Sequence, residues 1–275
     1  MKPMLARTLG PKFDSFPAFV QPKFNGERAL CDTSVFQSRG EKLWKPSFFP
    51  HIIEEIQSLG IKAIFDGELY VHGWSLGRIG SAVGVNNKEP NADTPHIEYH
   101  IFDIVDLHRP FSQRFFDIYT PLMQANLPHV KVAPTALVHN RDELELHFHQ
   151  YVNRGYEGLM IRTDGPYEFG EHEGRNGPTS YRSKTLHKHK SWTDGEFMCV
   201  GVTEGEGKAA IGIGALICCT DKLLEQFNIG TGFDDSDRIA LAVNPPIGKL
   251  IKVRYNSLTE RGVPVPASYL GVCPE

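Results

Sequence analysis

The hexapeptide Lys23-Phe24-Asn25-Gly26-Glu27-Arg28 constrains this chain more than any other segment. It follows an apolar stretch at 16–20, so Lys23 is expected near the end of a β-strand. Gly26 allows a tight turn beside a ligand, and Arg28 offers a planar fork for phosphate or ribose oxygens. The pattern predicts that the Lys23 amine attacks the α-phosphorus of a nucleoside triphosphate. A protonated amine cannot attack, so neighbouring cations or a metal ion must favour its neutral form.

Bulk properties indicate a globular protein of a reducing compartment. A length of 275 residues allows two domains with real cores. No apolar run approaches the ~20 residues of a membrane helix, and residues 1–6 lack the apolar core of a secretion signal. Five cysteines without a disulfide or metal-binding spacing fit reducing conditions. We therefore expect no membrane association and a cytoplasmic location, in a bacterial cell or in a host infected by a virus or phage.

Charge is distributed unevenly along a chain whose net charge is −4. The densest basic cluster combines Arg182, Lys184, Lys188 and Lys190 with two interspersed histidines. A second cluster contains Lys249, Lys252 and Arg254. Either cluster is suited to tracking phosphates, although the total charge does not favour nucleic-acid binding. The alternative is a solvated charged face, which fits the second cluster better than the first.

The order of predicted elements indicates an α+β first part. Strand-like runs occur at 18–20, 29–36, 63–71, 97–105, 130–133 and 157–162. Helical periodicity occurs at 48–59, 115–125 and 141–154, with Asp142 near a helix start. Strands that mix with segregated helices are typical of α+β domains.

The pattern changes near residue 192. Five short strands follow, at 196–202, 215–220, 224–229, 249–255 and 268–272, joined by loops that contain Gly and Pro. Five strands in about eighty residues suit a small closed barrel, for which the oligonucleotide-binding (OB) fold is the leading candidate. We expect one domain at 1–191 and a second at 192–275.

Four segments that follow Lys23 in the chain add chemically suitable groups. Asp66-Gly67-Glu68-Leu69 offers a carboxylate for a ribose hydroxyl or a metal, and residues 99–103 offer an aromatic ring, Phe102, for a base. Glu157 precedes an apolar strand and suits Mg²⁺. Lys188 and Lys190 alternate along a predicted strand, so both project from one face.

Together these segments resemble the covalent nucleotidyltransferase superfamily, and most closely the minimal ATP-dependent DNA ligases, above all the compact ligases of large DNA viruses. The resemblance covers essentially the whole chain. It includes Leu5-Ala6-Arg7-Thr8-Leu9, Ser38-Arg39, residues 165–170, Ile229-Gly230-Thr231-Gly232-Phe233, Asp237-Arg238 and Ile247-Gly248-Lys249-Leu250. It implies a nucleotidyltransferase (ATP-grasp-like ligase) domain followed by a small all-β OB-fold barrel.

The resemblance also implies roles for individual residues. Lys23 becomes the adenylated nucleophile, and Gln21 reads the adenine edge. The remaining roles are these: Arg28 and Arg39 on the nucleotide and the nick phosphate, Glu68 on the ribose or a metal, Phe102 stacked on adenine, Glu157 on the metal, Lys188 and Lys190 on the α-phosphate, and Arg182 on the 5′-phosphate or pyrophosphate. The implied cofactors are ATP, held as lysyl-AMP, and Mg²⁺ or Mn²⁺.

Each of these residues also has a simpler interpretation. Phe102 lies in an apolar strand, where an aromatic residue normally belongs to the core. Glu68 and Glu157 read equally as ordinary carboxylates at strand ends, and the lysine pair as a solvated strand face. The correct order of five segments, rather than any single residue, favours the functional interpretation.

Two of the departures from the family pattern bear directly on the chemistry. Asn25 replaces the usual aspartate and keeps a hydrogen-bond acceptor without the charge. In the last motif, at 262–273, Val265 and Cys273 stand where arginines are expected to orient the leaving pyrophosphate. Losing that charge should slow the first phosphoryl transfer. Arg254 and Arg261 are candidate substitutes.

The sequence therefore predicts an ATP-dependent DNA ligase that seals 3′-OH/5′-phosphate nicks in duplex DNA as a monomer. The resemblance implies a place in DNA replication, recombination or repair. One alternative is an RNA ligase or an mRNA-capping guanylyltransferase, which share the nucleophile motif. Another is a nick-binding protein with impaired self-adenylation, motivated by Val265 and Cys273.

Overall fold

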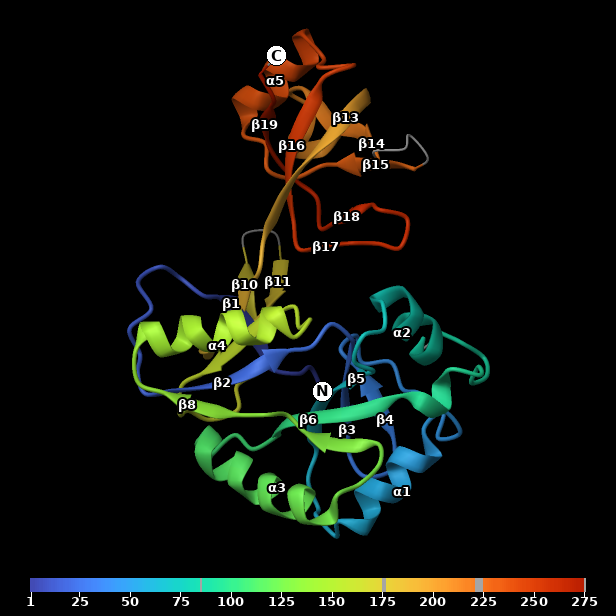
Figure 1. Cartoon of the computed structure of the whole chain (residues 1–275), viewed down its shortest axis with the longest axis vertical. Helices are drawn as coiled ribbons and strands as arrows, with labels where there is room; N and C mark the ends of the chain where they lie inside the picture. The colour runs from blue at the N-terminus through green and yellow to red at the C-terminus, as the bar shows by residue number, and fades with distance from the viewer. Residues whose placement is uncertain (85, 175–176, 221–224, 275) are drawn as a thin grey trace. The chain divides into compact units, whose positions relative to one another are not determined.

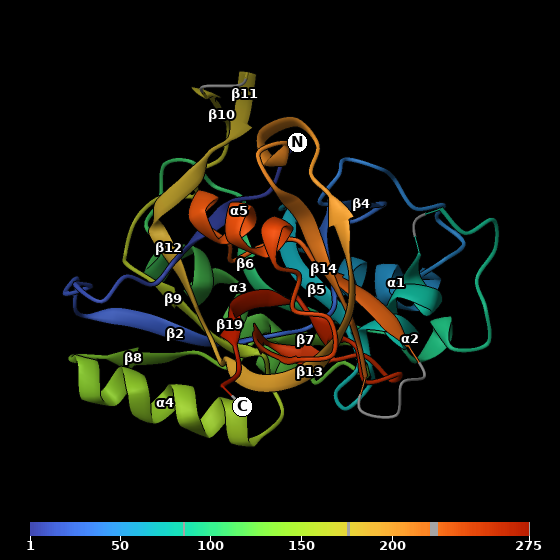
Figure 2. The same cartoon turned by 90° about the horizontal axis from the view of Figure 1, so that it is seen from above.

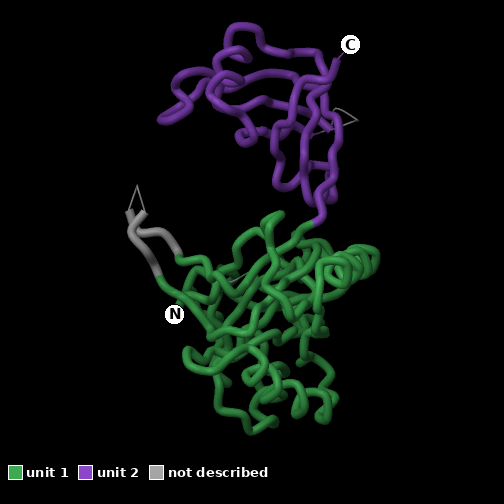
Figure 3. The backbone as a smooth tube through the Cα atoms, turned by 90° about the vertical axis from the view of Figure 1, so that its left-hand side faces the viewer, with its two compact units in different colours: residues 1–190 green, residues 191–275 purple. Residues whose placement is uncertain are grey.

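A computed structural model of the chain describes residues 1–84, 86–174, 177–220 and 225–274, with backbone alone at 171–174 and 177–180. The chain forms two compact units, Met1–Lys190 and Ser191–Glu275, which Figure 3 shows in green and purple. The division falls one residue before the expected domain boundary. Each unit has its own sheets and its own apolar core.

One five-stranded sheet of the first unit carries the predicted nucleophile. Its strand order is β1 (Leu5–Thr8), β12 (Arg182–Lys190), β9 (Gly158–Arg162), β2 (Ala18–Lys23) and β8 (Ala136–Val138). Lys23, Gly158 and Lys190 lie opposite one another on the three central strands. This register places the two lysines on either side of a glycine. Helix α4 (Arg141–Asn153) packs on this sheet (Figure 2).

A second five-stranded sheet lies beside it and contributes the other half of the pocket. Its strand order is β4 (Phe36–Ser38), β3 (Glu27–Cys31), β5 (Phe65–Tyr70), β6 (Glu98–Ile104) and β7 (Val130–Val132) (Figure 1). Its helices are α1 (Pro50–Ser58), α2 (Leu76–Val83), α3 (Phe111–Ala125) and the 3₁₀ turn η1 (Thr94–His96). These helices and the sheet share the largest apolar core of the unit.

The single strand expected at 29–36 is wrong, because the chain makes a hairpin there. The Asp32 carboxylate accepts hydrogen bonds from the backbone N–H groups of Ser34 and Val35, and Thr33 has a φ of 77°. An aspartate that bonds to the backbone two residues on favours a turn over a strand. The hairpin between β3 and β4 carries Arg39 at its far end.

Local signals explain the helices. Ile52 and Ile56 are spaced by four residues and bury one face of α1. The Asn140 side chain accepts a hydrogen bond from the Glu143 N–H and caps α4, so Asp142 lies in the first turn of the helix. Helix α2, which the sequence pattern did not reveal, begins at the Ser75 cap and contains two glycines that weaken a helical signal.

Buried ion pairs join the two sheets. Asp103 on β6 is fully buried and receives hydrogen bonds from Arg114 on α3 and Arg162 on β9, at 2.7–3.1 Å. Gln21 on β2 adds a second link by donating to the Phe102 carbonyl on β6. Removing one partner of such a group leaves a buried charge without compensation. These contacts therefore fix the spacing between the sheets.

The second unit is built around one antiparallel sheet. Its strand order is β15 (Gln226–Ile229), β14 (Ile213–Cys219), β13 (Thr193–Glu204), β16 (Leu250–Tyr255) and β19 (Ser268–Val272). Short elements complete the two units: β10 (Glu171–Gly174) and β11 (Gly177–Ser180) in the first, and η2 (Gly207–Ala209), α5 (Asp235–Val243), β17 (Ser257–Leu258) and β18 (Pro264–Val265) in the second. Leu224, at the start of one expected strand, lies outside the described residues.

The expected closed barrel needs a correction. Within the described residues, no ladder joins the edge strands β15 and β19. Just beyond β15, Thr231 forms an isolated parallel bridge with Ser268, in which the Tyr269 N–H donates to the Thr231 carbonyl at 2.9 Å, and the Thr231 hydroxyl donates to the Ala267 carbonyl at 2.9 Å. The chain turns at Gly232 (φ 93°), where an added Cβ would lie 2.4 Å from the Tyr269 carbonyl oxygen. The turn brings the edges together for one residue pair without a continuous ladder. Among the described residues, no helix is long and apolar enough to cross a membrane.

Gly158→Ala should disrupt the sheet between the two lysines. The added Cβ would lie 2.1 Å from the His189 carbonyl oxygen and 3.0 Å from the Lys190 Cα, so a strand must move. We expect the free energy of unfolding to fall by about 2–3 kcal/mol in urea titrations. Gly80→Ala in α2 is the control, since its Cβ meets nothing within 4 Å, and should be neutral or stabilising by up to about 1 kcal/mol. Equal stability of the two variants would contradict this packing.

Candidate active site

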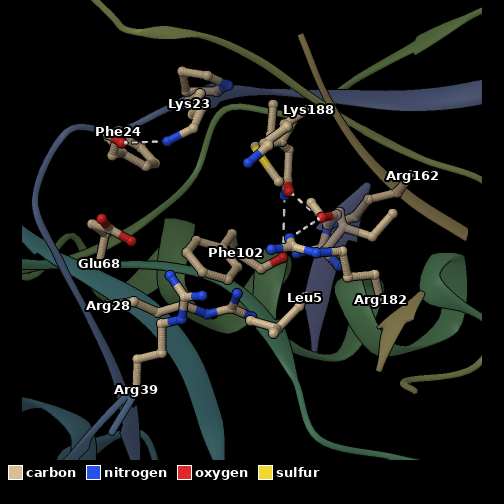
Figure 4. Close-up of a pocket in the computed structure, with 15 residues that line it drawn as sticks. Leu5, Lys23, Phe24, Arg28, Arg39, Glu68, Phe102, Arg162, Arg182 and Lys188 are labelled. Carbon is tan, nitrogen blue, oxygen red and sulfur yellow. Dashed lines mark hydrogen bonds between the residues drawn. The ribbon is translucent and has the colours of Figure 1, made fainter. Parts of the chain in front are cut away.

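A pocket lies between the two sheets of the first unit (Figure 4). Its volume is about 240 Å³, which suits one small organic ligand. The lining residues come from both sheets: Leu5, Ala6, Gln21, Pro22, Lys23, Phe24, Arg28, Arg39, Glu68, Phe102, Met160, Arg162, Arg182, Leu186 and Lys188. Eight of the ten predicted site residues are in this set. Glu157 and Lys190 adjoin it through their contacts with each other and with Lys23.

The predicted nucleophile is held by a carboxylate that also binds a second lysine. The Lys23 Nζ forms an ion pair with Glu157 Oε2, and the Lys190 Nζ forms one with Glu157 Oε1. Burial opposes ionisation of Glu157, but the two ammonium groups outweigh it and hold the pKa of this carboxylate below its usual value. Glu157 therefore remains ionised at neutral pH. Lys23 keeps one-fifth of its side-chain surface exposed.

Lys188 is the lysine of β12 that lines the pocket. It shares a strand face with Lys190, as the alternation predicted, but only Lys190 is ion-paired with Glu157 in the described structure. Burial lowers the pKa of Lys188, and Lys190, Arg182 and Lys23 lower it further. Four cations therefore lie near one another, an arrangement that attracts phosphate oxygens.

Glu68 faces the pocket from β5. Its Oε1 accepts a hydrogen bond from the Gly26 N–H at 3.2 Å. Burial raises the pKa of Glu68 to about 7, against the opposing effects of Lys23, Arg28 and the Gly26 hydrogen bond. Gly26 is required for this approach, because an added Cβ would lie 2.4 Å from the Leu69 carbonyl oxygen.

Arg28 lines the pocket, but much of its hydrogen-bonding capacity is used inside the protein. Its Nε and Nη2 donate to the two oxygens of the buried Asp66 at 2.9 and 2.5 Å. Its Nη1 donates to the Met4 carbonyl at 2.6 Å. Three of the five N–H donors of a guanidinium are therefore committed, which leaves two for a ligand.

The role expected for the Gln21 side chain, reading the adenine edge, does not fit the structure. Its Nε2 donates to the Phe102 carbonyl and the Thr135 hydroxyl, and its Oε1 accepts from the Arg162 Nε at 2.9 Å. Both amide protons are thus used within the protein, and the side chain is 1% exposed. Gln21 instead fixes the backbone of Phe102. The Phe102 ring is partly exposed, with the guanidinium carbons of Arg28 and Arg162 at 5.3 and 5.5 Å from its centroid.

The other two predicted arginines differ in their freedom. Arg39 follows β4 and, among the described residues, forms no hydrogen bond or ion pair, so its guanidinium is available to an anion. Figure 4 shows it beside Arg28, across the pocket from Lys23. Arg182 is exposed at the start of β12, and its Nη1 donates to the Ala6 carbonyl at 2.8 Å.

The carboxylates here suit a metal ion only in part. Within the described residues, no three or more His, Cys, Asp and Glu side chains gather to hold one. Mg²⁺ is commonly bound by one or two carboxylates together with substrate phosphates and water. Glu157 fits such a site, because each of its carboxylate oxygens can accept a second partner besides its lysine. Glu68 fits less well, because its raised pKa leaves it partly protonated at neutral pH.

The buried charges beneath the pocket have no recognisable pattern in the sequence. Arg162 is 3% exposed and both lines the pocket and binds Asp103, while Asp66 binds Arg28 and the Tyr167 hydroxyl. Each lies inside a motif that the sequence had singled out for a neighbouring residue. Their partners lie at least 38 positions away, so no local pattern reveals them.

The second unit offers less free positive charge than its sequence indicated. Arg254 and Lys252 both pair with Asp194, Arg254 at 2.9 Å and Lys252 at 3.7 Å. Arg261 pairs with Glu225 at 3.0 Å. The two candidate substitutes for the missing arginines, Arg254 and Arg261, are thus already ion-paired. Val265 is 42% exposed on β18.

Two models of known protein families match this chain. A family model described as the ATP dependent DNA ligase domain matches residues 3–176. The chain belongs to the ATP-dependent DNA ligase family. A second model, the DNA ligase OB-like domain, matches residues 204–272. The expected combination of a nucleotidyltransferase domain and an OB-fold domain is confirmed.

Individual relatives carry the same family name. The DNA ligase of African swine fever virus (isolate Pretoriuskop Pr4) is 27% identical in an alignment 275 positions long that covers 92% of this chain. The chain spans 62% of the length of that viral relative. The DNA ligase of Haemophilus influenzae is 23% identical over 91% of this chain and 84% of its own length.

Solved structures of DNA ligases share the architecture of this family member. A Lig E DNA ligase aligns over 99% of both chains with a TM-score of 0.78 and 24% identity, which bears on the fold alone. The Chlorella virus DNA ligase–adenylate aligns over 100% of this chain and 98% of its own, with a TM-score of 0.54 and 26% identity.

The raised pKa of Glu68 generates a prediction about stability. In the unfolded chain this carboxyl titrates near 4.5, and in the folded protein near 7, so raising the pH from 5 to 8 places a costly charge in the native state. Glu68→Gln removes that charge. The free energy of unfolding of Glu68→Gln minus that of the wild type should therefore increase by about 2 kcal/mol from pH 5 to pH 8 in urea titrations. Glu54→Gln, at an exposed position, is the control. If the stability difference between Glu68→Gln and the wild type does not change with pH, the raised pKa of Glu68 is refuted.

Proposed function

We propose that this chain is an ATP-dependent DNA ligase that seals 3′-OH/5′-phosphate nicks in duplex DNA. The observation that carries the proposal is the placement of Lys23 beside a pocket that also presents Glu68, Phe102, Lys188 and Arg39. A nucleotide fits this set, with its base against Phe102, its ribose near Glu68 and its phosphates near the lysines. Membership of the ligase family supports the same reaction.

In the first step, the Lys23 nitrogen attacks the α-phosphorus of ATP. A phosphoramidate N–P bond forms, the bond to the bridging oxygen breaks, and pyrophosphate leaves with the electron pair. The amine must lose a proton, and Glu157 is the nearest base because it already contacts the Lys23 Nζ. Lys188 stabilises charge on the α-phosphate oxygens as it develops.

A divalent cation, Mg²⁺ or Mn²⁺, fits this step best through Glu157. Held by Glu157, the ion would supply neutralisation of phosphate charge. Lys190, whose carboxylate partner is Glu157, would then contact the nucleotide phosphates beside the ion. The residues of the protein bind and orient the nucleotide and deprotonate the Lys23 amine.

The second and third steps act on nicked DNA. The 5′-phosphate oxygen attacks the phosphorus of lysyl-AMP, a P–O bond forms, the N–P bond breaks and Lys23 leaves as the amine. Arg39 and Arg182, which line the pocket, are the proposed contacts of the 5′-phosphate. The 3′-hydroxyl then attacks that activated phosphate, and AMP leaves. We infer that the protein acts as a monomer inside a bacterial cell or an infected host.

A nick-binding protein with weak self-adenylation is the second candidate. It is favoured by Val265 and Cys273 and by the ion pairs that occupy Arg254 and Arg261. Such a protein seals DNA that is already adenylated but reacts poorly with ATP. An RNA ligase or capping enzyme is disfavoured by the match to the DNA ligase OB-like domain.

Lys23→Ala should abolish covalent labelling by ATP radiolabelled at the α-phosphate in the presence of Mg²⁺, because the amine is the attacking group. Labelling is measured after denaturing gel electrophoresis. Lys62→Ala, an exposed lysine in the same unit, is the matched control and should label like the wild type. Equal labelling of the Lys23 variant would remove the nucleophile from the proposal.

Sealing assays separate the candidates. The ligase joins singly nicked DNA with ATP, and Lys23→Ala still joins nicks that carry a pre-formed 5′-adenylate, because the third step does not need the amine as nucleophile. Wild-type protein that joins only the adenylated nick matches the second candidate. Labelling by GTP rather than ATP, or a preference for nicks with RNA strands, would reassign the substrate.

A further inference from the structure

Four hydrogen-bonded groups form a closed ring at the wall of the pocket. The Met4 N–H donates to the Tyr167 hydroxyl at 3.0 Å, and that hydroxyl donates to Asp66 Oδ2 at 2.6 Å. Arg28 Nη2 donates to the same Asp66 oxygen at 2.5 Å, and Arg28 Nη1 closes the ring on the Met4 carbonyl at 2.6 Å. Met4, Asp66 and Tyr167 are each no more than 2% exposed.

The ring ties together parts of the chain that are far apart in sequence. Met4 precedes β1 at the edge of the first sheet, whereas Arg28 and Asp66 lie on β3 and β5 of the second sheet. Tyr167 follows β9 and is fixed by its N–H, which donates to the Asp106 carbonyl at 3.1 Å. The Tyr167 phenol thus joins the N-terminal segment to the second sheet, beside the direct bond from Arg28 to Met4.

Two pocket walls depend on this ring. Leu5 and Ala6, which line the pocket, follow directly after Met4. The ring commits two N–H donors of Arg28, and the Nε donates to the other Asp66 oxygen, so the direction of the two remaining donors is set by Asp66 and Met4. Without the phenol hydroxyl, Asp66 Oδ2 loses a donor and the Met4 N–H loses its acceptor.

We propose that Tyr167 is a positioning residue that sets the pocket wall at Met4–Ala6 and aims Arg28 at the bound nucleotide. It acts through Asp66 and does not line the pocket itself. The inference rests on the proposed function, since it concerns the nucleotide that the pocket accepts. It assigns a functional role to a buried phenol that otherwise reads as core.

The competing interpretation is that Tyr167 only fills space. Its ring packs with Met4 and Leu186 in a small apolar cluster, and Tyr167→Phe keeps that packing while removing only the hydroxyl. Tyr99→Phe provides the matched control. Tyr99 is also fully buried, and its hydroxyl bonds to the Ala29 and Phe65 carbonyls at 2.9 and 3.0 Å, outside the ring.

The kinetic experiment measures enzyme–adenylate formation as a function of ATP concentration. We expect Tyr167→Phe to raise the KM for ATP about 10-fold and to leave kcat within about 2-fold of the wild type, because the reacting amine is not touched. Tyr99→Phe should leave both values within about 2-fold. An unchanged KM in Tyr167→Phe, or an equal rise in Tyr99→Phe, would overturn the proposal.

A second measurement does not depend on catalysis. Hydrogen–deuterium exchange of a peptide that covers residues 1–9 reports the Met4 amide. Tyr167→Phe should speed its exchange about 10-fold while Tyr99→Phe leaves it unchanged. If the wild type takes no label from ATP, the proposed function fails, and this exchange result still decides whether the ring holds the wall. Unchanged exchange in Tyr167→Phe would reject the ring.

Discussion

The pocket depends on one buried carboxylate shared by two arginines. Asp103 receives hydrogen bonds from Arg114 and Arg162, and all three side chains are at most 3% exposed. Since Arg162 belongs to the first sheet and Asp103 to the second, this contact holds together the sheets that carry Lys23 and Glu68. Two cations share one anion here, so positive charge is left over directly beneath the pocket. That excess favours an anionic ligand even before the other residues that line the pocket are considered.

Much of the site could be predicted from sequence, because the order of its motifs resembles that of the ligase family and strand alternation places Lys188 and Lys190 on one face. Lys188 and Lys190 lie on one face of β12, and Glu157 precedes the neighbouring strand opposite Lys23. Phe102 and Glu68 reach the same pocket from adjacent strands. The order of the motifs therefore predicted which strands meet at the pocket, and each motif contains a residue whose side chain lines or adjoins it.

The remainder depended on partners distant in sequence. The side-chain amide of Gln21 is hydrogen-bonded to Arg162 and Thr135. Both partners are distant in sequence, so the position of Gln21 in its motif could not show that this amide is already occupied. The basic run that contains Arg254 is balanced by Asp194 across a strand pair. The predicted closed barrel is replaced by an open sheet with one bridge near its edges. Pairing between edge strands produces no periodic pattern in the sequence, so its extent could not be predicted.

The paired amines on Glu157 also bear on chemical selectivity. An ammonium clamped by a carboxylate is inert towards aldehydes, acyl phosphates and other stray electrophiles of the cell, which react with free amines. Lys23 and Lys190 both contact Glu157 in this way. While these ion pairs hold, neither amine is available to such electrophiles, so the ion pairs protect both lysines from covalent damage.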